Sequence, residues 1–394
     1  MKGLYLSNID PQQSFGYMSK ILGQIKGFNQ LGVDMELLCF NAEAQIVLTQ
    51  SPIPTSVSSP TIASLILGPA GQNLFTRRFN LLRQALKRII ETKPDFLYLR
   101  YPRSEPLYLY FLSRARKRFP KMLILSEFPT FPYDAEYKKA ISPKDKTVFL
   151  LDQLTRQLLK NYVDQVVSIN YKPPIFGITT ISIDNGIQIS DYEVVTDKPH
   201  LDPSTIHLIG VANVSPWHGY DRILQGLGYY YHSSSPSREV YFHIVGARMP
   251  YLHDLQQFVN QLQIQDYVIF HKPAQGQELD TLFDQSHLAI GVLGGHRKGL
   301  EVMSPLKNRE YCARGIPFVL SHQDPDFPEE FPYCLHWPSD ESPIDIKKLV
   351  DFWESVSDRQ ATATCMRDYA QNNISWSSKL KPVKAYLETQ IKKH

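Results

Sequence analysis

The sequence predicts an α/β protein with two domains, each a parallel sheet covered by helices. Its 394 residues exceed the size at which a single hydrophobic core stops growing, which favours two domains of just under 200 residues. Short apolar runs alternate with amphipathic helical patterns in two successive series. A polar stretch that contains prolines, residues 194–204, separates the two series.

Apolar runs bounded by turn residues are the predicted strands. In the first domain they lie at residues 3–7, 33–40, 95–101, 122–127 and 165–169. Helical patterns lie between them, for example over residues 16–32 and 146–163. In the second domain the strands lie at residues 206–212, 240–246, 267–271, 288–294 and 317–321. The two domains are therefore expected to span residues 1–184 and 185–375.

Composition and charge exclude several classes of function. The 42 Lys and Arg residues against 39 Asp and Glu residues give a net charge of +3, so nucleic acid is not expected as the main partner. The four cysteines form no C-x-x-C, which argues against a zinc site and a disulfide framework: Cys39, Cys312, Cys334 and Cys365. The sequence shows neither an apolar leader nor a run long enough to cross a bilayer, so we expect a cytoplasmic protein.

The stretch SPLKNREYCARG predicts a helix over residues 305–314 with a charged start. Ser304 suits the N-cap, Pro305 suits the first helical position, and a glycine follows the last turn. Lys307 and Glu310 then lie one turn apart on the same side, at a helix start that already carries a partial positive charge. We expect a negatively charged ligand there. The alternative is a solvated ion pair between the two side chains.

Three predicted strands of the second domain end in loops that carry glycine and basic residues. Glycine permits close approach to the backbone, and parallel strands place such loops at one edge of their sheet. The basic residues are His218, Arg222, Arg297, Lys298 and Lys307. Together they predict a pocket for a diphosphate, while each residue alone is equally compatible with ordinary surface charge.

Six stretches carry a resemblance to a known family: SFGY, SIDNGIQISDY, GVANVSPWHGYDRIL, VYFHIVG, GLEVMSPLKNREYCARGIPFV and a closing helix with Trp376. With these, nearly the whole chain resembles a GT-B glycosyltransferase of the retaining family 4 type, as in polysaccharide assembly. The resemblance implies two Rossmann-like domains facing a cleft, with the C-terminal helix, residues 376–394, returning to the N-terminal domain. It also implies transfer of a sugar from a nucleotide diphosphate, bound mainly by the C-terminal domain, to an acceptor bound by the N-terminal domain.

The resemblance also assigns roles to individual residues. Lys307 would contact the diphosphate, and Glu310 would accept hydrogen bonds from the ribose hydroxyls. Gly16 would let the first N-terminal loop approach the donor. Backbone N–H groups for the phosphates would come from Ser304, Pro305 and Leu306. The other implied contacts of the nucleotide sugar are Asn213, His218, Gly219, Arg222, Arg297 and Lys298. Similar proteins often have a lysine in place of His218, so the contribution of this residue depends on its protonation.

Catalysis is expected from Lys307, Glu301 and Glu127. Members of the resembled family retain the anomeric configuration, and we expect the leaving diphosphate, stabilised by Lys307 and its basic neighbours, to assist without a covalent intermediate. Glu301 would face the donor sugar, although eight residues rather than the usual seven separate it from Glu310. Glu127 is either an acceptor contact or catalytic base, or a carboxylate paired with a nearby arginine.

No metal and no cofactor are expected. Asp324 and Asp326 form a D-x-D like the metal-binding motif of other glycosyltransferases, but the flanking prolines favour an ordinary loop. The histidines show no H-E-x-x-H or other metal spacing. Basic loops and a helix start are sufficient to hold a diphosphate without Mg²⁺.

Residues 74–93 predict a basic amphipathic helix. The apolar residues at helical spacing are Phe75, Phe79, Leu82, Leu86 and Ile89, and basic residues occupy the other sides. This stripe either packs on the sheet or binds an anionic membrane, which would suit a lipid-linked acceptor at the inner face of the membrane. A glycan or a protein acceptor is also compatible with the sequence.

Two other functions remain open at this point. A sugar-nucleotide isomerase with the same two-domain fold would need catalytic acids clustered in the cleft. A binding or regulatory subunit without catalysis is compatible with His218 and with the shifted position of Glu301.

Overall fold

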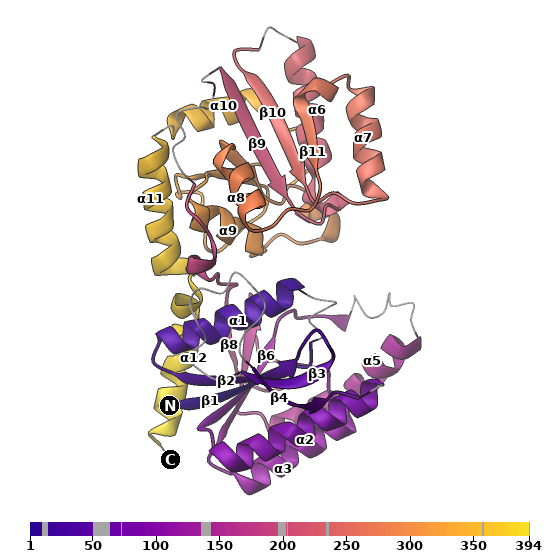
Figure 1. Cartoon of the computed structure of the whole chain (residues 1–394), viewed down its shortest axis with the longest axis vertical. Helices are drawn as coiled ribbons and strands as arrows, with labels where there is room; N and C mark the ends of the chain where they lie inside the picture. The colour runs from indigo at the N-terminus through magenta and orange to yellow at the C-terminus, as the bar shows by residue number, and fades with distance from the viewer. Residues whose placement is uncertain are drawn as a thin grey trace. The chain divides into compact units, whose positions relative to one another are not determined.

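The computed structural model describes residues 1–9, 15–49, 64–71, 73–134, 143–195, 202, 204–233, 236–356 and 358–393, and the chain divides into two compact units. Unit 1 contains Met1–Gln188 and Ser375–His394, and unit 2 contains Ile189–Ile374 (Figure 1). The sequence places these divisions after residues 184 and 375. The C-terminal segment belongs to the first unit in both cases.

Unit 1 is built on an eight-stranded sheet with the order β4-β3-β2-β1-β5-β6-β7-β8. The strands are β1 (Lys2–Leu6), β2 (Asp34–Phe40), β3 (Gln45–Thr49), β4 (Ser64–Pro69), β5 (Phe96–Arg100), β6 (Leu123–Phe128), β7 (Gln165–Ile169) and β8 (Thr180–Ile183). Five of them confirm predicted strands, and β3, β4 and β8 are additional. The expectation of a fully parallel sheet is wrong at one edge, where β3 runs antiparallel to β2 and β4. Only residues 41–44 connect β2 to β3, which is too short for a crossover.

Helices cover both faces of this sheet (Figure 1). One face packs against α1 (Phe15–Gln30) and α12 (Trp376–Ile391). The other face packs against α2 (Leu74–Thr92), α3 (Pro106–Arg118) and α5 (Pro143–Thr155). Each interface is a continuous apolar core, as expected for strands that are buried on both sides.

The return of the C-terminal helix to unit 1 is confirmed. Trp376, which is 2% exposed, packs against α1. A Cβ atom on Gly27 of α1 would lie 2.7 Å from the Cβ of Trp376 and 2.9 Å from the backbone nitrogen of Ser377. Glycine at this position therefore allows α1 and α12 to approach each other closely.

Unit 2 is built on a six-stranded parallel sheet with the order β11-β10-β9-β12-β13-β14. The strands are β9 (Thr205–Val211), β10 (Glu239–Val245), β11 (Val268–His271), β12 (Leu288–Ile290), β13 (Phe318–Leu320) and β14 (Cys334–His336). The first five confirm predicted strands, and β14 is additional. One face carries α6 (Tyr220–Ser233), α7 (Tyr251–Gln261) and α10 (Ile346–Ser355), and α8 (Gln277–Asp284), α9 (Leu306–Arg314) and α11 (Arg359–Tyr369) belong to the other side.

Three histidines on adjacent strands of unit 2 form a hydrogen-bonded row. The Nδ1 atom of His207 lies 2.9 Å from the Nε2 atom of His243, and the Nδ1 atom of His243 lies 2.9 Å from the Nε2 atom of His271. A hydrogen bond between two imidazole nitrogens needs one donor and one acceptor, so each bond is lost when both rings become fully protonated. Two neighbouring rings of the row therefore cannot both be protonated while the bond between them is kept.

A fourth ring, that of His287, lies beside His207 at the β9 end of this row. The Nδ1 atom of His287 accepts a hydrogen bond of 2.9 Å from the backbone N–H of His207. Burial lowers the pKa of His287 to about 3, with smaller contributions from Arg359, His207 and Arg238. Burial also lowers the pKa of His243 to about 3, and it lowers that of His271, which Glu278 opposes.

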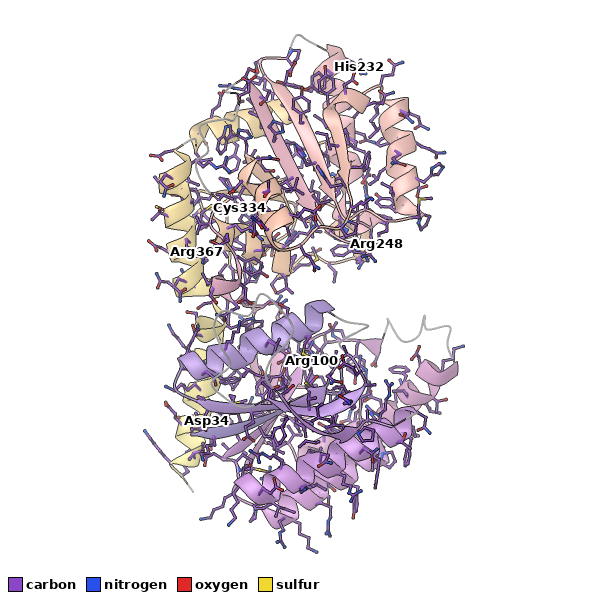
Figure 2. All side chains as sticks on the ribbon, viewed as in Figure 1. Asp34, Arg100, His232, Arg248, Cys334 and Arg367 are labelled. Atoms are coloured by element: carbon purple, nitrogen blue, oxygen red, sulfur yellow. The ribbon has the colours of Figure 1, made fainter. Side chains whose placement is uncertain are left out.

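We expect unit 2 to lose stability in mild acid. Because the folded unit keeps these histidines neutral while the unfolded chain protonates them near pH 6.5, the free energy of unfolding falls as the pH drops below 6.5. For His287, which is 6% exposed, the loss at pH 5 is about 2 kcal/mol. Thermal unfolding from pH 7.5 to pH 5 measures it. His243→Gln should reduce the acid sensitivity, and the exposed His232 (Figure 2) provides the control variant His232→Gln. Equal acid sensitivity in the wild type and in both variants would contradict the proposed role of the histidine row in the loss of stability.

Candidate functional site

The loops after β9 and β12 meet at the carboxyl edge of the unit 2 sheet. The first loop contains the 3₁₀ turn Pro216–His218 and leads into α6, and the second contains the 3₁₀ turn Gly295–Lys298. Helix α9 begins a few residues later, at Leu306. Since β9 and β12 are neighbours in a parallel sheet, their carboxyl ends bring these segments together.

Gly219 brings the two loops into backbone contact. Its φ angle is +70°, and a Cβ atom there would lie 2.7 Å from both the backbone nitrogen of Gly294 and the carbonyl carbon of Leu293. The backbone N–H of Leu293 donates to the carbonyl oxygen of His218 at 3.0 Å. The position therefore requires glycine for both conformation and space.

Lys307 lies in the first turn of α9 and points at a buried tyrosine. Its Nζ atom donates a hydrogen bond of 3.2 Å to the hydroxyl oxygen of Tyr220 and lies 5.4 Å from the centroid of that ring. Burial lowers the pKa of Lys307 to about 7, and the charge of Glu310 opposes this shift. Among the residues that the structure describes, no carboxylate forms an ion pair with this ammonium group, so an anionic ligand would gain from binding beside it.

If a nucleoside diphosphate binds beside Lys307, its affinity should therefore fall as the pH rises above 7. In the ligand-free protein Lys307 loses its proton near pH 7, and binding of a phosphate must restore it, which costs up to about tenfold in affinity per pH unit. Calorimetry with UDP and ADP between pH 7 and pH 9 measures this slope. Lys307→Arg should flatten the slope, because a guanidinium stays charged throughout this range. The same slope in both proteins would show that another group titrates.

His218 and Lys298 lie close to Lys307 in this cluster. The Nδ1 atom of His218 accepts a hydrogen bond of 3.0 Å from the backbone N–H of Ser215. Burial, followed by the charge of Lys307, lowers the pKa of His218 to about 3, with a smaller contribution from Lys298. His218 is thus neutral near pH 7, and the expectation that its protonation matters there is wrong. The Nζ atom of Lys298 lies 4.1 Å from the centroid of the Trp217 ring.

Glu310 has a different partner from the one that the sequence suggests. Its Oε1 atom accepts a hydrogen bond of 2.9 Å from the Nε atom of Arg314, one turn later in α9. The alternative of an ion pair between Lys307 and Glu310 is therefore wrong. Burial raises the pKa of Glu310, and Arg314 opposes this shift. The side chain remains 19% exposed, so a ligand can reach it.

Arg222 must be removed from the predicted phosphate site. Its side chain is buried, and its guanidinium donates hydrogen bonds to backbone oxygens of Leu293, Ser342 and Pro338 and to the carboxylate of Asp340. These acceptors engage all three nitrogen atoms of the guanidinium. Arg222 therefore holds the loops together and has no donors directed to a ligand.

Arg297 is also neutralised by the protein itself. Its Nη2 atom lies 2.7 Å from the Oδ2 atom of Asp221, and it also pairs with Glu341. Two carboxylates around one guanidinium leave no net positive charge for a diphosphate. For this reason Arg297 is withdrawn as a predicted contact of the diphosphate.

The start of α9 differs by one residue from the prediction. Pro305 lies at the N-cap in extended conformation, and the helix runs from Leu306 to Arg314, so Ser304 does not cap it. Pro305 also has no N–H group to offer to a phosphate. Leu306, which is 39% exposed, is the first residue whose N–H lies in the open turn of the helix.

Two other predicted contacts of the donor lie on the surface of unit 2. Asn213 and Glu301 are exposed. The backbone carbonyl of Glu301 accepts a hydrogen bond of 2.9 Å from Gln323, next to the β-bridge between Val302 and Gln323. This bridge fixes the backbone of Glu301, while its carboxylate remains accessible.

In unit 1, Glu127 is part of a buried ionic cluster. Its carboxylate lies 3.0 Å from the Nη1 atom of Arg100 (Figure 2) and 3.5 Å from the Nζ atom of Lys20, and it accepts a hydrogen bond of 2.7 Å from Gln24. Its pKa is lowered: burial would raise it, but the charges of Lys20 and Arg100 prevail. The alternative of a carboxylate paired with arginine is confirmed, and Glu127 is withdrawn as catalytic base and as acceptor contact because it is fully buried.

Gly16 lies in the first turn of α1. The loop that precedes it, residues 10–14, lies outside the described residues, so its approach to the donor stays a prediction.

The two carboxylates of the D-x-D in unit 2 are paired with an arginine. Asp324 and Asp326 both accept hydrogen bonds from Arg309, whose Nη2 atom lies 2.7 Å from the Oδ1 atom of Asp324. All three side chains are at least 90% buried. Across the described parts of the chain, no group of three or more His, Cys, Asp or Glu side chains is arranged to hold a metal ion.

Sequence reasoning missed two residues of the site. Tyr220 directly follows the His218-Gly219 pair, and this adjacency is the signal that was available for it. Arg314 lies four residues after Glu310, which is the spacing of an ion pair on a helix. Tyr220 contacts Lys307, and Arg314 contacts Glu310, so each touches one of the two side chains that the sequence singled out.

Comparison with known proteins identifies the fold. No protein-family model and no curated protein sequence matches the chain. Among solved structures, the catalytic domain of starch synthase IV from Arabidopsis thaliana, bound to ADP and acarbose, matches 99% of each chain with a TM-score of 0.61 and 11% identity. The chain has the GT-B fold.

Two further structures show how broadly this GT-B fold is shared. Anabaena Alr3699/HepE, in complex with UDP and glucose, matches 99% of this chain and 100% of its own, with a TM-score of 0.57 and 13% identity. A putative UDP-N-acetylglucosamine 2-epimerase from Listeria monocytogenes matches 100% and 97%, with a TM-score of 0.50 and 10% identity. At such low identity the similarity shows the GT-B architecture, and the function has to be argued from the site.

Proposed function

We propose that the protein is a retaining glycosyltransferase that moves a sugar from a nucleotide diphosphate donor to a glycan, lipid-linked or protein acceptor. The observation that carries the proposal is the position of Lys307, whose ammonium group is held at the start of α9 by the neutral hydroxyl of Tyr220, one turn before Glu310. Phosphate binds favourably where a helix start and a lysine coincide. The GT-B fold, which is shared with starch synthase IV, agrees with this assignment.

In the proposed reaction, the bond between the anomeric carbon of the sugar and the diphosphate oxygen breaks, and a bond to the acceptor oxygen forms on the same face. Negative charge grows on the leaving diphosphate, where Lys307 and Lys298 stabilise it. The acceptor proton passes to the leaving phosphate oxygen. Glu310 accepts hydrogen bonds from the ribose, and the accessible Glu301 contacts the donor sugar.

The proposed reaction uses protein cations in place of a divalent metal ion. The two carboxylates that most resemble a metal motif, Asp324 and Asp326, are buried and occupied by Arg309. Turnover is therefore expected to be unchanged by a chelator.

A panel of radiolabelled UDP-, ADP- and GDP-sugars, with and without EDTA, tests the proposal. Slow hydrolysis of one donor in the absence of an acceptor, with release of a sugar of retained configuration, is the expected result. Donor binding without any turnover would instead support a non-catalytic binding subunit. Failure to bind any nucleotide sugar would refute the placement of the site.

A sugar-nucleotide isomerase is the second candidate, because a putative UDP-N-acetylglucosamine 2-epimerase shares the fold. The same panel distinguishes the two enzymes, since an isomerase returns an epimerised donor. The withdrawal of Glu127 from the catalytic residues disfavours this candidate, because it removes a carboxylate that general acid and base chemistry would need.

We further propose that unit 1 binds an anionic membrane through the outer face of α2, α3 and α5. Within the described parts of the chain, no helix is long and apolar enough to cross a membrane. The predicted stripe on α2 is divided: Leu82 and Ile89 are buried, whereas Phe75 and Phe79 are 64% and 46% exposed. Exposed apolar residues on α3, α5 and the following turn are Tyr110, Leu150, Leu154 and Leu158.

Basic residues line a groove near the carboxyl ends of α2 and α3. This groove, of about 290 Å³ between α2 and α3, is lined by Leu86, Ile90, Arg114, Lys117, Arg118 and Phe119. An apolar surface flanked by basic side chains is typical of proteins that lie on anionic bilayers. A lipid-linked acceptor would then be available at this surface.

Co-sedimentation with vesicles should show binding to phosphatidylglycerol but not to phosphatidylcholine. Binding should fall with added salt, because surface attraction is screened over about 10 Å at 0.1 M. The double change Phe75→Ser and Phe79→Ser should weaken it, whereas Tyr229→Ser, at a residue of unit 2 that is 65% exposed, provides the control. Equal sedimentation with both lipids would exclude the membrane proposal.

A further inference from the structure

Arg314 holds the carboxylate of Glu310, the group that we propose to accept hydrogen bonds from the ribose hydroxyls. It is the last residue of α9, and its side chain is 5% exposed. Its Nε atom donates to the Oε1 atom of Glu310 at 2.9 Å, and its Nη1 atom donates to the Oδ1 atom of Asp280, in α8, at 2.7 Å. A guanidinium that bridges two carboxylates on different helices restricts the orientation of both.

The surroundings of Arg314 restrict the guanidinium itself. Its central carbon lies 4.4 Å from the centroid of the Phe283 ring and 5.3 Å from that of the Tyr192 ring. The backbone at the end of α9 is held separately, because Arg367 of α11 (Figure 2) donates to the carbonyl oxygens of Ala313 and Tyr192. The geometry of the Arg314 side chain is thus preorganised before any ligand binds.

This arrangement leaves one side of Glu310 available. Arg314 engages the Oε1 atom, and the 19% exposure of the side chain leaves the carboxylate open to a ligand. Without Arg314, burial would favour the protonated acid, which has a weaker capacity to accept hydrogen bonds from two hydroxyl groups. Arg314 therefore supports both the position and the charge of this acceptor.

We propose that Arg314, anchored by Asp280, is a positioning residue that sets the preference of the protein for donors with intact ribose hydroxyls. The inference rests on the proposed function, because it assigns the ribose to Glu310. Arg314 acts through Glu310 and touches no reacting atom. Nucleotides that lack the 2′ and 3′ hydroxyls gain nothing from the Arg314–Glu310 pair, and they serve as the matched probe.

The test compares UDP and ADP with their 2′,3′-dideoxy counterparts by calorimetry on the full chain. The wild-type protein is expected to favour the ribonucleotide by about 10- to 100-fold, as for hydrogen bonds to a charged acceptor. Glu310→Gln and Arg314→Gln should each reduce this ratio to within about threefold of one. Arg367→Gln removes an arginine from the same helix end without touching Glu310, so it should keep the wild-type ratio.

The outcomes separate this inference from the function on which it rests. A wild-type ratio in Arg314→Gln together with a lost ratio in Glu310→Gln overturns the role of Arg314 and leaves the nucleotide site intact. Absence of nucleoside diphosphate binding in the wild-type protein, or an unchanged ratio in Glu310→Gln, overturns the nucleotide placement and the inference with it.

Loss of the ratio in Arg367→Gln as well would reduce Arg314 to a general packing residue. If Arg314→Gln does not fold, Arg314→Lys takes its place. Lysine keeps the charge but cannot form the two-pronged bridge, so the ratio should fall, and an unchanged ratio contradicts the inference.

Discussion

Lys307→Ala is expected to lower the turnover of the proposed transferase by about 100-fold or more, the effect of removing one preorganised group that stabilises a developing anion. The affinity for the donor should fall less, because the charge on the diphosphate grows only as the sugar departs. The measurement is steady-state kinetics beside calorimetry with the same donor. The melting temperature should change little, since within the described residues Lys307 donates one hydrogen bond, to Tyr220.

Two variants serve as controls for this experiment. Glu310→Gln should mainly weaken donor binding, by about 1 to 3 kcal/mol, because ribose contacts change little during the reaction. Lys298→Ala should have a smaller effect on turnover than Lys307→Ala, because its ammonium group lies over the Trp217 ring instead of at the start of α9. Normal turnover and affinity in Lys307→Ala, with only a lower melting temperature, would make Lys307 a structural residue.

Arg309→Leu is expected to destabilise unit 2 by about 3 to 5 kcal/mol, because it leaves the carboxylates of Asp324 and Asp326 buried without their cation. For a unit of this size the loss corresponds to a fall of roughly 10 °C in the melting temperature. Thermal unfolding followed by circular dichroism measures it. The large effect reflects an uncompensated buried charge and not the net value of the ion pair.

The matched control is Arg238→Leu, which removes a surface ion pair with Glu354 in the same unit. Both partners are partly exposed, at 33% and 48%, so the expected cost is about 1 kcal/mol or less. A stable Arg309→Leu protein whose turnover becomes sensitive to a chelator would contradict the structural role and would restore Asp324 and Asp326 as a metal motif.

Much of the fold follows from local patterns in the sequence. Ten predicted strands are present, and the helix that starts near Pro305 is displaced by one residue only. The antiparallel strands β3 and β4 were missed for different reasons: β4 lies at the edge of the sheet and is largely exposed, whereas β3 lies between β4 and β2 and its short buried apolar run was overlooked. The C-terminal helix returned to unit 1 as the resemblance implied, because Trp376 fills the space that Gly27 leaves on α1.

The site was only partly predictable, and the reason is visible in its arginines. In the sequence Arg222 and Arg297 look as suitable for a phosphate as Lys307 does. The donors of Arg222 are occupied by groups such as the backbone carbonyl of Ser342, which is 120 positions away in the chain, and Arg297 is neutralised by acidic partners such as Asp221, 76 positions away. Pairings over such distances have no local sequence signal.

The sequence by itself determined the two α/β halves, the carboxyl edge of the second sheet at which the loops of that sheet gather, and the helix that presents Lys307 and Glu310. These features arise from hydrophobic periodicity and helix punctuation, which are properties of neighbouring residues. Only the tertiary structure decided which charges remain available to a ligand: Lys307 faces the neutral Tyr220, whereas Glu127 lies buried between Lys20 and Arg100. The physical reason is that burial and long-range partners, and not residue type, set the charge and accessibility of each side chain.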